Sequence, residues 1–110
     1  MKLKILGFDK KLVPLILKGE KTITWRLFGH HNRLMVNDIV FLENTQTREM
    51  FGKARITYIK DKTMKEISDG DKEGHEEFSN EKEMYKVYSG YYGCRVDENT
   101  PVRVIRFKIL

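Results

Sequence analysis

Apolar side chains recur at two different spacings along this chain. Five segments are typical of strands, and the alternation is clearest in the first two of them: residues 2–8, 22–27, 39–42, 49–59 and 102–109. Helical spacing occupies residues 13–17 and a later stripe made of Met84, Val87, Tyr88 and Tyr91, which we expect to pack into the core. The order of these segments predicts an α+β domain with few short helices, of the kind that forms a small curved sheet or barrel.

Capping residues indicate where the first helix begins and ends. Asp9 is a candidate cap, but Pro14 fits a helix only in its first turn, so regular helix is expected to begin near Val13. The same helix is expected to stop at Gly19.

The second half of the chain carries further start signals for helices. Thr63 and Glu66 stand three residues apart, as in a capping box, which predicts a short helix. Residues 69–77 are acidic and are expected to form a loop or an irregular turn. Ser79 or Asn80 is expected to start the last helix.

Length and composition bound the class of protein. At 110 residues, of which 40% are hydrophobic and 34% charged, residues 1–110 are expected to form a single domain with one ordinary core. The lone Cys94 cannot form an internal disulfide. The sequence holds no signal peptide and no apolar run long enough to span a bilayer, so we expect a cytoplasmic protein with no membrane partner. Composition leaves the oligomeric state open.

Charge points weakly toward ligands that carry phosphate. The net charge is +5, and a basic surface raises the local concentration of phosphates. A candidate basic rim consists of Arg48, Lys53, Arg55, Lys60, Lys62, Arg103, Arg106 and Lys108. The alternation of these residues describes an ordinary solvated sheet face equally well.

The sharpest feature of the sequence is the segment Gly19-Glu20-Lys21-Thr22-Ile23-Thr24-Trp25-Arg26. A helix ends at its glycine, and a strand begins at once. Along that strand Ile23, Trp25 and Leu27 share one face and are expected in the core, which leaves Thr22, Thr24 and Arg26 to face solvent or a cleft.

The segment resembles the hallmark of the ASCH family, relatives of the PUA RNA-binding domain, in which a helix precedes G-x-K-T-x-T-x-R. The matching residues are Gly19, Lys21, Thr22, Thr24 and Arg26. Residues 37–40 resemble the family's G-D-x-[IV] strand entry, with Asn37 in place of the usual glycine. Glu73-Gly74-His75 resembles its [DE]-G-[FY] segment, and residues 104–107 resemble its closing strand.

The resemblance implies a small PUA-like β-barrel with two to three short helices and a basic cleft built around residues 19–26. The cleft would bind RNA or a nucleotide through Gly19, Lys21, Thr22, Thr24 and Arg26. We expect no cofactor and no metal.

The full K-T-I-T-x-R run is also similar to a small branch of amidohydrolases that deacetylate N4-acetylcytidine. Carried over from that branch, the catalytic residues are Lys21, Thr24 and a glutamate, most naturally Glu73, with Glu76 or Glu77 as alternatives. A threonine hydroxyl attacks well only when a base takes its proton, which a lysine of lowered pKa can do. Arg26 could bind a phosphate or a developing oxyanion.

One geometric condition accompanies this chemistry. In a regular strand Lys21 and Thr24 point to opposite faces, so the turn at residues 20–21 must be irregular for the two side chains to meet.

Other candidate sites carry less information. His30-His31, with His75 as a third ligand, lacks the spacing of a metal site, and Asp69-Gly70-Asp71 lacks the rest of a calcium loop. Binding of RNA or a nucleotide and amidohydrolysis of N4-acylated cytidine both remain open. A ribonuclease, also known in the wider family, has no histidine pair in the motif to favour it.

Overall fold

The computed structural model describes residues 4–27, 34–75 and 77–110. The elements in chain order are β1 (Ile5–Phe8), α1 (Val13–Leu17), β2 (Ile23–Leu27), β3 (Ile39–Asn44), β4 (Met50–Thr63), the 3-10 turn η1 (Met64–Glu66), α2 (Asp69–Lys72), α3 (Glu81–Tyr92) and β5 (Pro101–Ile109). This order confirms the α+β class.

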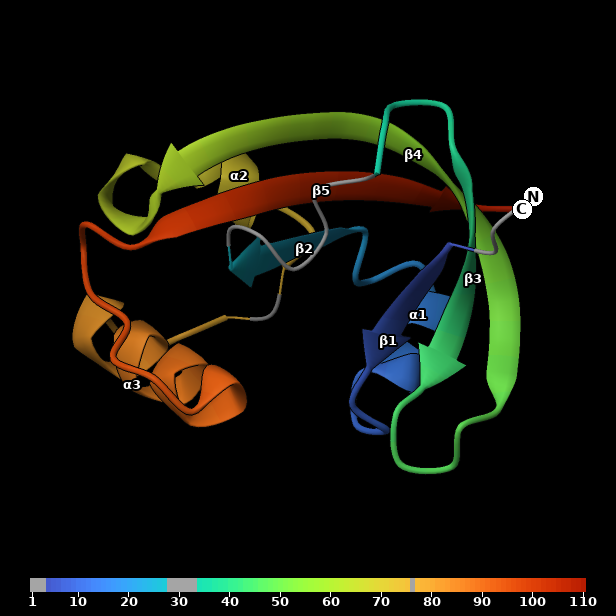
Figure 1. Ribbon diagram of the computed structural model, residues 1–110, viewed down its shortest axis with the longest axis horizontal. Coiled ribbons are helices and arrows are strands. Elements are labelled where there is room, and N and C mark those ends of the chain that lie inside the picture. The colour runs from blue at the N-terminus through green and yellow to red at the C-terminus, as the bar shows by residue number, and fades with distance from the viewer. Residues whose placement is uncertain (1–3, 28–33, 76) are drawn as a thin grey trace.

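The strands of the described chain form one curled sheet in the order β1-β3-β4-β5-β2. β1 pairs with β3 in parallel, and the other neighbours are antiparallel. The long strands β4 and β5 arch over the molecule, while α3 lies under one end of the arch and β1 with α1 under the other (Figure 1). The sheet is therefore a half-barrel, in which the edge strands β1 and β2 do not pair with each other.

The core has two clusters, one under each end of the arch. The first gathers residues of β1, α1, β3, β4 and β5, and the second gathers residues of β2, η1, α3 and β5. Ile23, Trp25 and Leu27 are all buried in the second cluster, as the period of two predicts. In β1 the buried side chains are Leu6 and Phe8, whereas Ile5 is 36% exposed.

The first helix has the expected bounds and an unexpected cap. It begins at Val13 with Pro14 in its first turn, but Leu12 rather than Asp9 holds the N-cap position. Asp9 is three residues too early for that role. Its Oδ1 instead accepts a hydrogen bond from Lys11 N–H at 2.9 Å and so closes a turn ahead of the helix.

The later helix starts are also set by caps. The capping box of Thr63 and Glu66 is confirmed and begins η1, and Asn80 caps α3 by accepting from the N–H of Glu83. The expectation of an irregular turn over residues 69–77 is wrong for its first part. Ser68 and Asp71 form a second capping box that stabilises the single helical turn α2.

Candidate functional site

The turn between α1 and β2 places the chemistry-bearing residues of the G-x-K-T-x-T-x-R segment. Gly19 has φ +78°, a left-handed conformation that glycine adopts without strain. The N–H groups of Gly19 and Glu20 return to the carbonyls of Ile16 and Leu15, and Lys21 N–H also bonds to Leu15 O at 3.1 Å. These bonds close the end of the helix tightly and turn the chain into β2.

Lys21 is the buried lysine of this turn, with 2% of its surface exposed. Its Nζ donates a hydrogen bond to the carbonyl of Ile23, two residues further along the chain, at 2.8 Å. A buried lysine is uncommon because its amino group must leave water. Lys21 lies in the turn before β2, which begins at Ile23, so it does not follow the alternation of the strand.

Thr24 and Arg26 are joined by a hydrogen bond on the same face of β2. Arg26 Nε donates to Thr24 Oγ1 at 3.0 Å, and its NH2 group donates to Gly7 O on β1 at 2.8 Å. The guanidinium also lies 4.7 Å from the ring centre of Phe8, within the range of a cation–π contact. Arg26 therefore spans the opening between the two edge strands.

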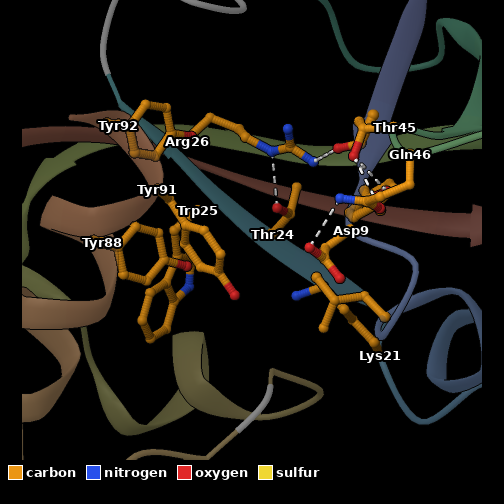
Figure 2. A pocket seen from close by; sticks show the side chains of 13 residues that line it. Asp9, Lys21, Thr24, Trp25, Arg26, Thr45, Gln46, Tyr88, Tyr91 and Tyr92 are labelled. Carbon is orange, nitrogen blue, oxygen red and sulfur yellow. Dashed lines mark hydrogen bonds between the residues drawn. The ribbon is translucent and has the colours of Figure 1, made fainter. Parts of the chain in front are cut away.

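Lys21, Thr24 and Arg26 line one cavity of about 340 Å³ under the arch. On one side of it lie aromatic residues of β2 and α3, and on the other lie residues of the β1–α1 and β3–β4 loops (Figure 2). The described lining residues are Gly7, Phe8, Asp9, Leu12, Lys21, Thr24, Trp25, Arg26, Thr45, Gln46, Tyr88, Tyr91 and Tyr92. Gly19 and Thr22 do not line this cavity.

Three residues on the aromatic side of the cavity, Trp25, Tyr88 and Tyr91, are ones that the sequence pattern assigns to the core. Trp25 and Tyr88 are buried as expected, with ring centres 5.9 Å apart. Tyr91 is half exposed, so the expectation that it packs into the core is wrong. It sits one turn beyond Tyr88 on α3, where the helix face turns from the core to the cavity. Helical spacing alone cannot distinguish these two surroundings.

Three polar lining residues were not predicted as site residues from the sequence: Asp9, Thr45 and Gln46. Gln46 Nε2 donates to Asp9 Oδ2 at 3.2 Å, and Gln46 Oε1 accepts from Lys10 N–H at 2.7 Å. Thr45 N–H donates to Phe8 O at 3.0 Å. These bonds tie the β3–β4 loop to the end of β1, because β1 and β3 are parallel neighbours.

Thr22 lies outside the cavity and ties the start of β2 to its neighbours through backbone hydrogen bonds. Its N–H donates to Gly74 O at 2.9 Å, and its carbonyl accepts from Phe107 N–H at 3.1 Å. Gly74 has φ +81°, and a Cβ built there would lie 2.1 Å from Thr22 Oγ1. The glycine of the [DE]-G-[FY] segment therefore permits a close approach to β2. Asn37, in the place of the other family glycine, has φ +77°.

The structure does not bring Glu73 to this cavity. Glu73 is exposed, and it lines a neighbouring cavity of about 520 Å³ together with Glu77 and Phe78. Its backbone carbonyl accepts from Arg106 at 3.4 Å. Trp25 lies between the two cavities and lines both. Glu76 lies outside the described residues.

His75 and Asp71 fix the indole of Trp25 from the far side. The His75 ring stacks on Trp25 with centres 3.7 Å apart, and Trp25 Nε1 donates to Asp71 O at 3.2 Å. Burial raises the pKa of the Asp71 carboxyl, but hydrogen bonds from Lys62 and Ser68 outweigh it and hold that pKa below its usual range. The buried carboxylate is thus kept ionised, while the backbone carbonyl of the same residue holds the indole.

The candidate basic rim is partly neutralised by acidic neighbours. Lys62 pairs with Asp71, and Arg103 pairs with Asp61 at 2.7 Å, which holds the pKa of that carboxyl low. Other members of the rim, namely Lys53, Lys60 and Lys108, are exposed.

Other features of the described ranges stand apart from the cavity. Cys94 is a free, exposed thiol. Residues 4–27, 34–75 and 77–110 contain no group of three or more His, Cys, Asp or Glu side chains placed to hold a metal, and His30-His31 lies outside them. Over the same ranges no helix has the length and apolar character needed to cross a membrane.

No protein-family model and no curated protein matches the chain. Solved structures do match its fold. The ASCH domain from Lactobacillus crispatus aligns with a TM-score of 0.70 over 96% of this chain and 79% of its own, at 15% identity. EF3133 from Enterococcus faecalis aligns with a TM-score of 0.77 over 100% of this chain and 82% of its own, at 12% identity. The hypothetical protein PH0355 aligns with a TM-score of 0.73 over the whole of both chains, at 22% identity.

The chain therefore has the fold of ASCH domains. The small PUA-like barrel that the resemblance implies is confirmed in the form of a half-barrel, in which, among the described residues, the edge strands β1 and β2 do not pair.

Proposed function

We propose that the cavity under the arch binds one nucleoside unit, as a free nucleotide or as part of an RNA strand. The observation that carries this proposal is the burial of Lys21 (2% exposed) and Thr24 (5% exposed) in a cavity with an aromatic side. Polar residues on an ordinary solvated strand face would be exposed. Here their burial is offset by a cavity into which their polar groups can present hydrogen bonds.

The size and chemistry of the cavity fit such a ligand. Its volume of about 340 Å³ lies at the small end of the range for ligand sites, where a single nucleoside belongs and an RNA helix does not. Tyrosine and tryptophan rings suit a flat base, because stacking on aromatic side chains favours any nucleobase. Lys21 and Arg26 supply donors for base carbonyls or phosphate oxygens.

Titration of the protein with cytidine, CMP and a short single-stranded RNA tests the proposal. Lys21→Met keeps the length of the side chain and removes its donors, so we expect at least tenfold weaker binding, the equivalent of about one hydrogen bond to a charged group. Lys18→Met removes the same charge from an exposed position and should bind like wild type. Absence of binding by wild type at low salt would refute the proposal.

A second candidate function is the hydrolysis of N4-acetylcytidine, favoured by the hydrogen bond from Arg26 to Thr24 Oγ1. That bond orients the hydroxyl and leaves its proton available to a base. In this reaction the Lys21 amine acts as the base that takes the proton while Oγ1 attacks the acyl carbon. The bond to N4 of cytidine then breaks, N4 takes a proton, and water releases acetate from the acyl-threonine.

The assay for this activity is the appearance of cytidine and acetate from N4-acetylcytidine. Thr24→Val should abolish turnover, whereas Thr22→Val, which alters a threonine outside the cavity, should retain it. Glu73→Gln should also retain it, because that side chain lines the neighbouring cavity. Turnover by Thr24→Val at the wild-type rate, or none by wild type, would exclude this function.

A further inference from the structure

Asp9 is the carboxylate that the described chain presents to the cavity. It comes from the turn after β1, and its two oxygens are directed toward the space between Lys21 and Thr24 (Figure 2). Neither the nucleotide-binding residues carried over from the family nor the catalytic ones include it. We therefore ask which part of a bound nucleoside the Asp9 carboxylate would contact.

The carboxylate is held in one orientation by the protein. Oδ1 accepts from Lys11 N–H at 2.9 Å, and Oδ2 accepts from Gln46 Nε2 at 3.2 Å. Within the described ranges no lysine or arginine forms an ion pair with it. Each oxygen of an ionised carboxylate has about two acceptor positions, so each keeps one for a ligand. Two fixed acceptors side by side match a ligand with two adjacent donors.

Gln46 is the residue that holds this geometry. Its Nε2 donates to Asp9 while its Oε1 accepts from Lys10 N–H at 2.7 Å. Both ends of the amide are therefore engaged by the β1–α1 turn, and the amide acts as a brace between two loops. Gln46 is a positioning residue for the carboxylate.

Exposure separates the cavity into a floor and a rim. Lys21 and Thr24 are buried at the floor, whereas Asp9 is half-buried and Thr45 and Gln46 are exposed. A nucleoside joins a flat base to a polar sugar. With the base against the aromatic side and its polar edge at the floor, the sugar lies toward the rim.

We propose that Asp9 accepts hydrogen bonds from the 2′- and 3′-hydroxyls of ribose, and so makes the cavity selective for ribonucleosides over 2′-deoxyribonucleosides. This role rests on the proposed function of the same cavity. A carboxylate is a well-suited partner for a vicinal diol, because both hydroxyls can donate to it at once. The amino and imino edge of a base offers a similar pair of donors, and the experiment separates the two sources.

The test compares cytidine, 2′-deoxycytidine and uridine on wild type, Asp9→Asn and Glu49→Gln by calorimetric or NMR titration. Nucleosides are used because they are uncharged, so loss of one protein charge has no long-range effect on them. Asp9→Asn keeps the shape and can still accept from Lys11 N–H. Glu49→Gln removes an exposed carboxylate from the nearby β3–β4 loop. Thermal melts of all three proteins verify folding.

The expected result is that wild type and Glu49→Gln bind cytidine at least tenfold more tightly than 2′-deoxycytidine, and that Asp9→Asn binds both alike. Equal binding of the two by wild type would overturn the role of Asp9 and leave the proposed function intact. A preference that survives in Asp9→Asn would also overturn it. A third result would also overturn it: wild type binds cytidine and 2′-deoxycytidine equally but prefers cytidine to uridine, and Asp9→Asn loses that preference. Asp9 would then recognise the base and not the ribose. Binding of no nucleoside by wild type would overturn the role of Asp9, and the titrations with CMP and single-stranded RNA would then decide the proposed function separately.

Discussion

Substitution of Gly74 by alanine tests whether the close approach of the [DE]-G-[FY] segment to β2 is necessary. Gly74 has φ +81°, and a residue with a Cβ pays about 1–2 kcal/mol for that conformation. The added Cβ would also lie 2.1 Å from Thr22 Oγ1, too close without movement of the threonine. Together these terms predict a loss of about 3 kcal/mol in the free energy of unfolding, or about 10 °C or more in Tm.

Chemical denaturation of wild type, Gly74→Ala and Gly90→Ala measures the effect. Gly90 is the matched control, because it lies inside α3, where an added Cβ would meet no atom within 4 Å beyond its chain neighbours and its own helix backbone. Alanine there should raise the free energy of unfolding by about 0.5–1 kcal/mol through helix propensity. Substitution by alanine should thus lower the free energy of unfolding at Gly74 and raise it at Gly90.

A double-mutant cycle separates the two causes. Thr22→Ala removes the Oγ1 that the new methyl group meets, so combined with Gly74→Ala it should recover the steric part of the loss and not the conformational part. The reasoning is refuted if Gly74→Ala costs less than about 1 kcal/mol, or if Thr22→Ala recovers nothing.

Two further predictions concern the support of the Trp25 indole. Asp71→Asn should lower the free energy of unfolding by about 2 kcal/mol at pH 7, since the hydrogen bond from Lys62 loses a charged acceptor. The pKa of Asp71 is lower in the folded than in the unfolded protein, so the stability difference between wild type and Asp71→Asn should hold down to about pH 5 and shrink at lower pH. An unchanged stability difference at pH 3 would contradict the lowered pKa of Asp71. His75→Phe keeps a ring stacked on Trp25 but loses the hydrogen bond between His75 Nε2 and the Tyr88 hydroxyl (2.9 Å), so it should lower the free energy of unfolding by about 1 kcal/mol. His75→Ala also loses the stacked ring, so it should cost about 3 kcal/mol and shift the tryptophan fluorescence; equal effects of the two would show that the stack contributes nothing.

Local signals in the sequence predicted most of the fold. The capping residues Thr63 and Asn80 and the helix end at Gly19 each act within one turn of the chain, so their effects are visible without tertiary contacts. The prediction that Asp9 caps the first helix was wrong for the same reason. A turn in which Asp9 accepts from Lys11 N–H looks like a helix cap in the sequence.

The composition of the candidate site was only partly predictable. Lys21, Thr24 and Arg26 are neighbours in the chain and were found together. Asp9 and Gln46 meet only because β1 and β3 pair in parallel across more than 30 residues, a pairing that no local pattern announces. The location of a side chain such as Tyr91, between core and cavity, likewise depends on where a whole helix docks.

The hydrogen bond from Arg26 to Gly7 O has a consequence for handling the protein. In the part of the chain that the structure describes, β1 and β2 are the edge strands of the sheet, and an edge strand is a template for pairing with another chain. Arg26 occupies one backbone acceptor of β1 and places a positive charge at that edge. Any substitution of Arg26 made to weaken ligand binding therefore also removes a side chain that opposes edge-to-edge aggregation. Loss of activity in such a variant must be measured on protein shown to be monodisperse.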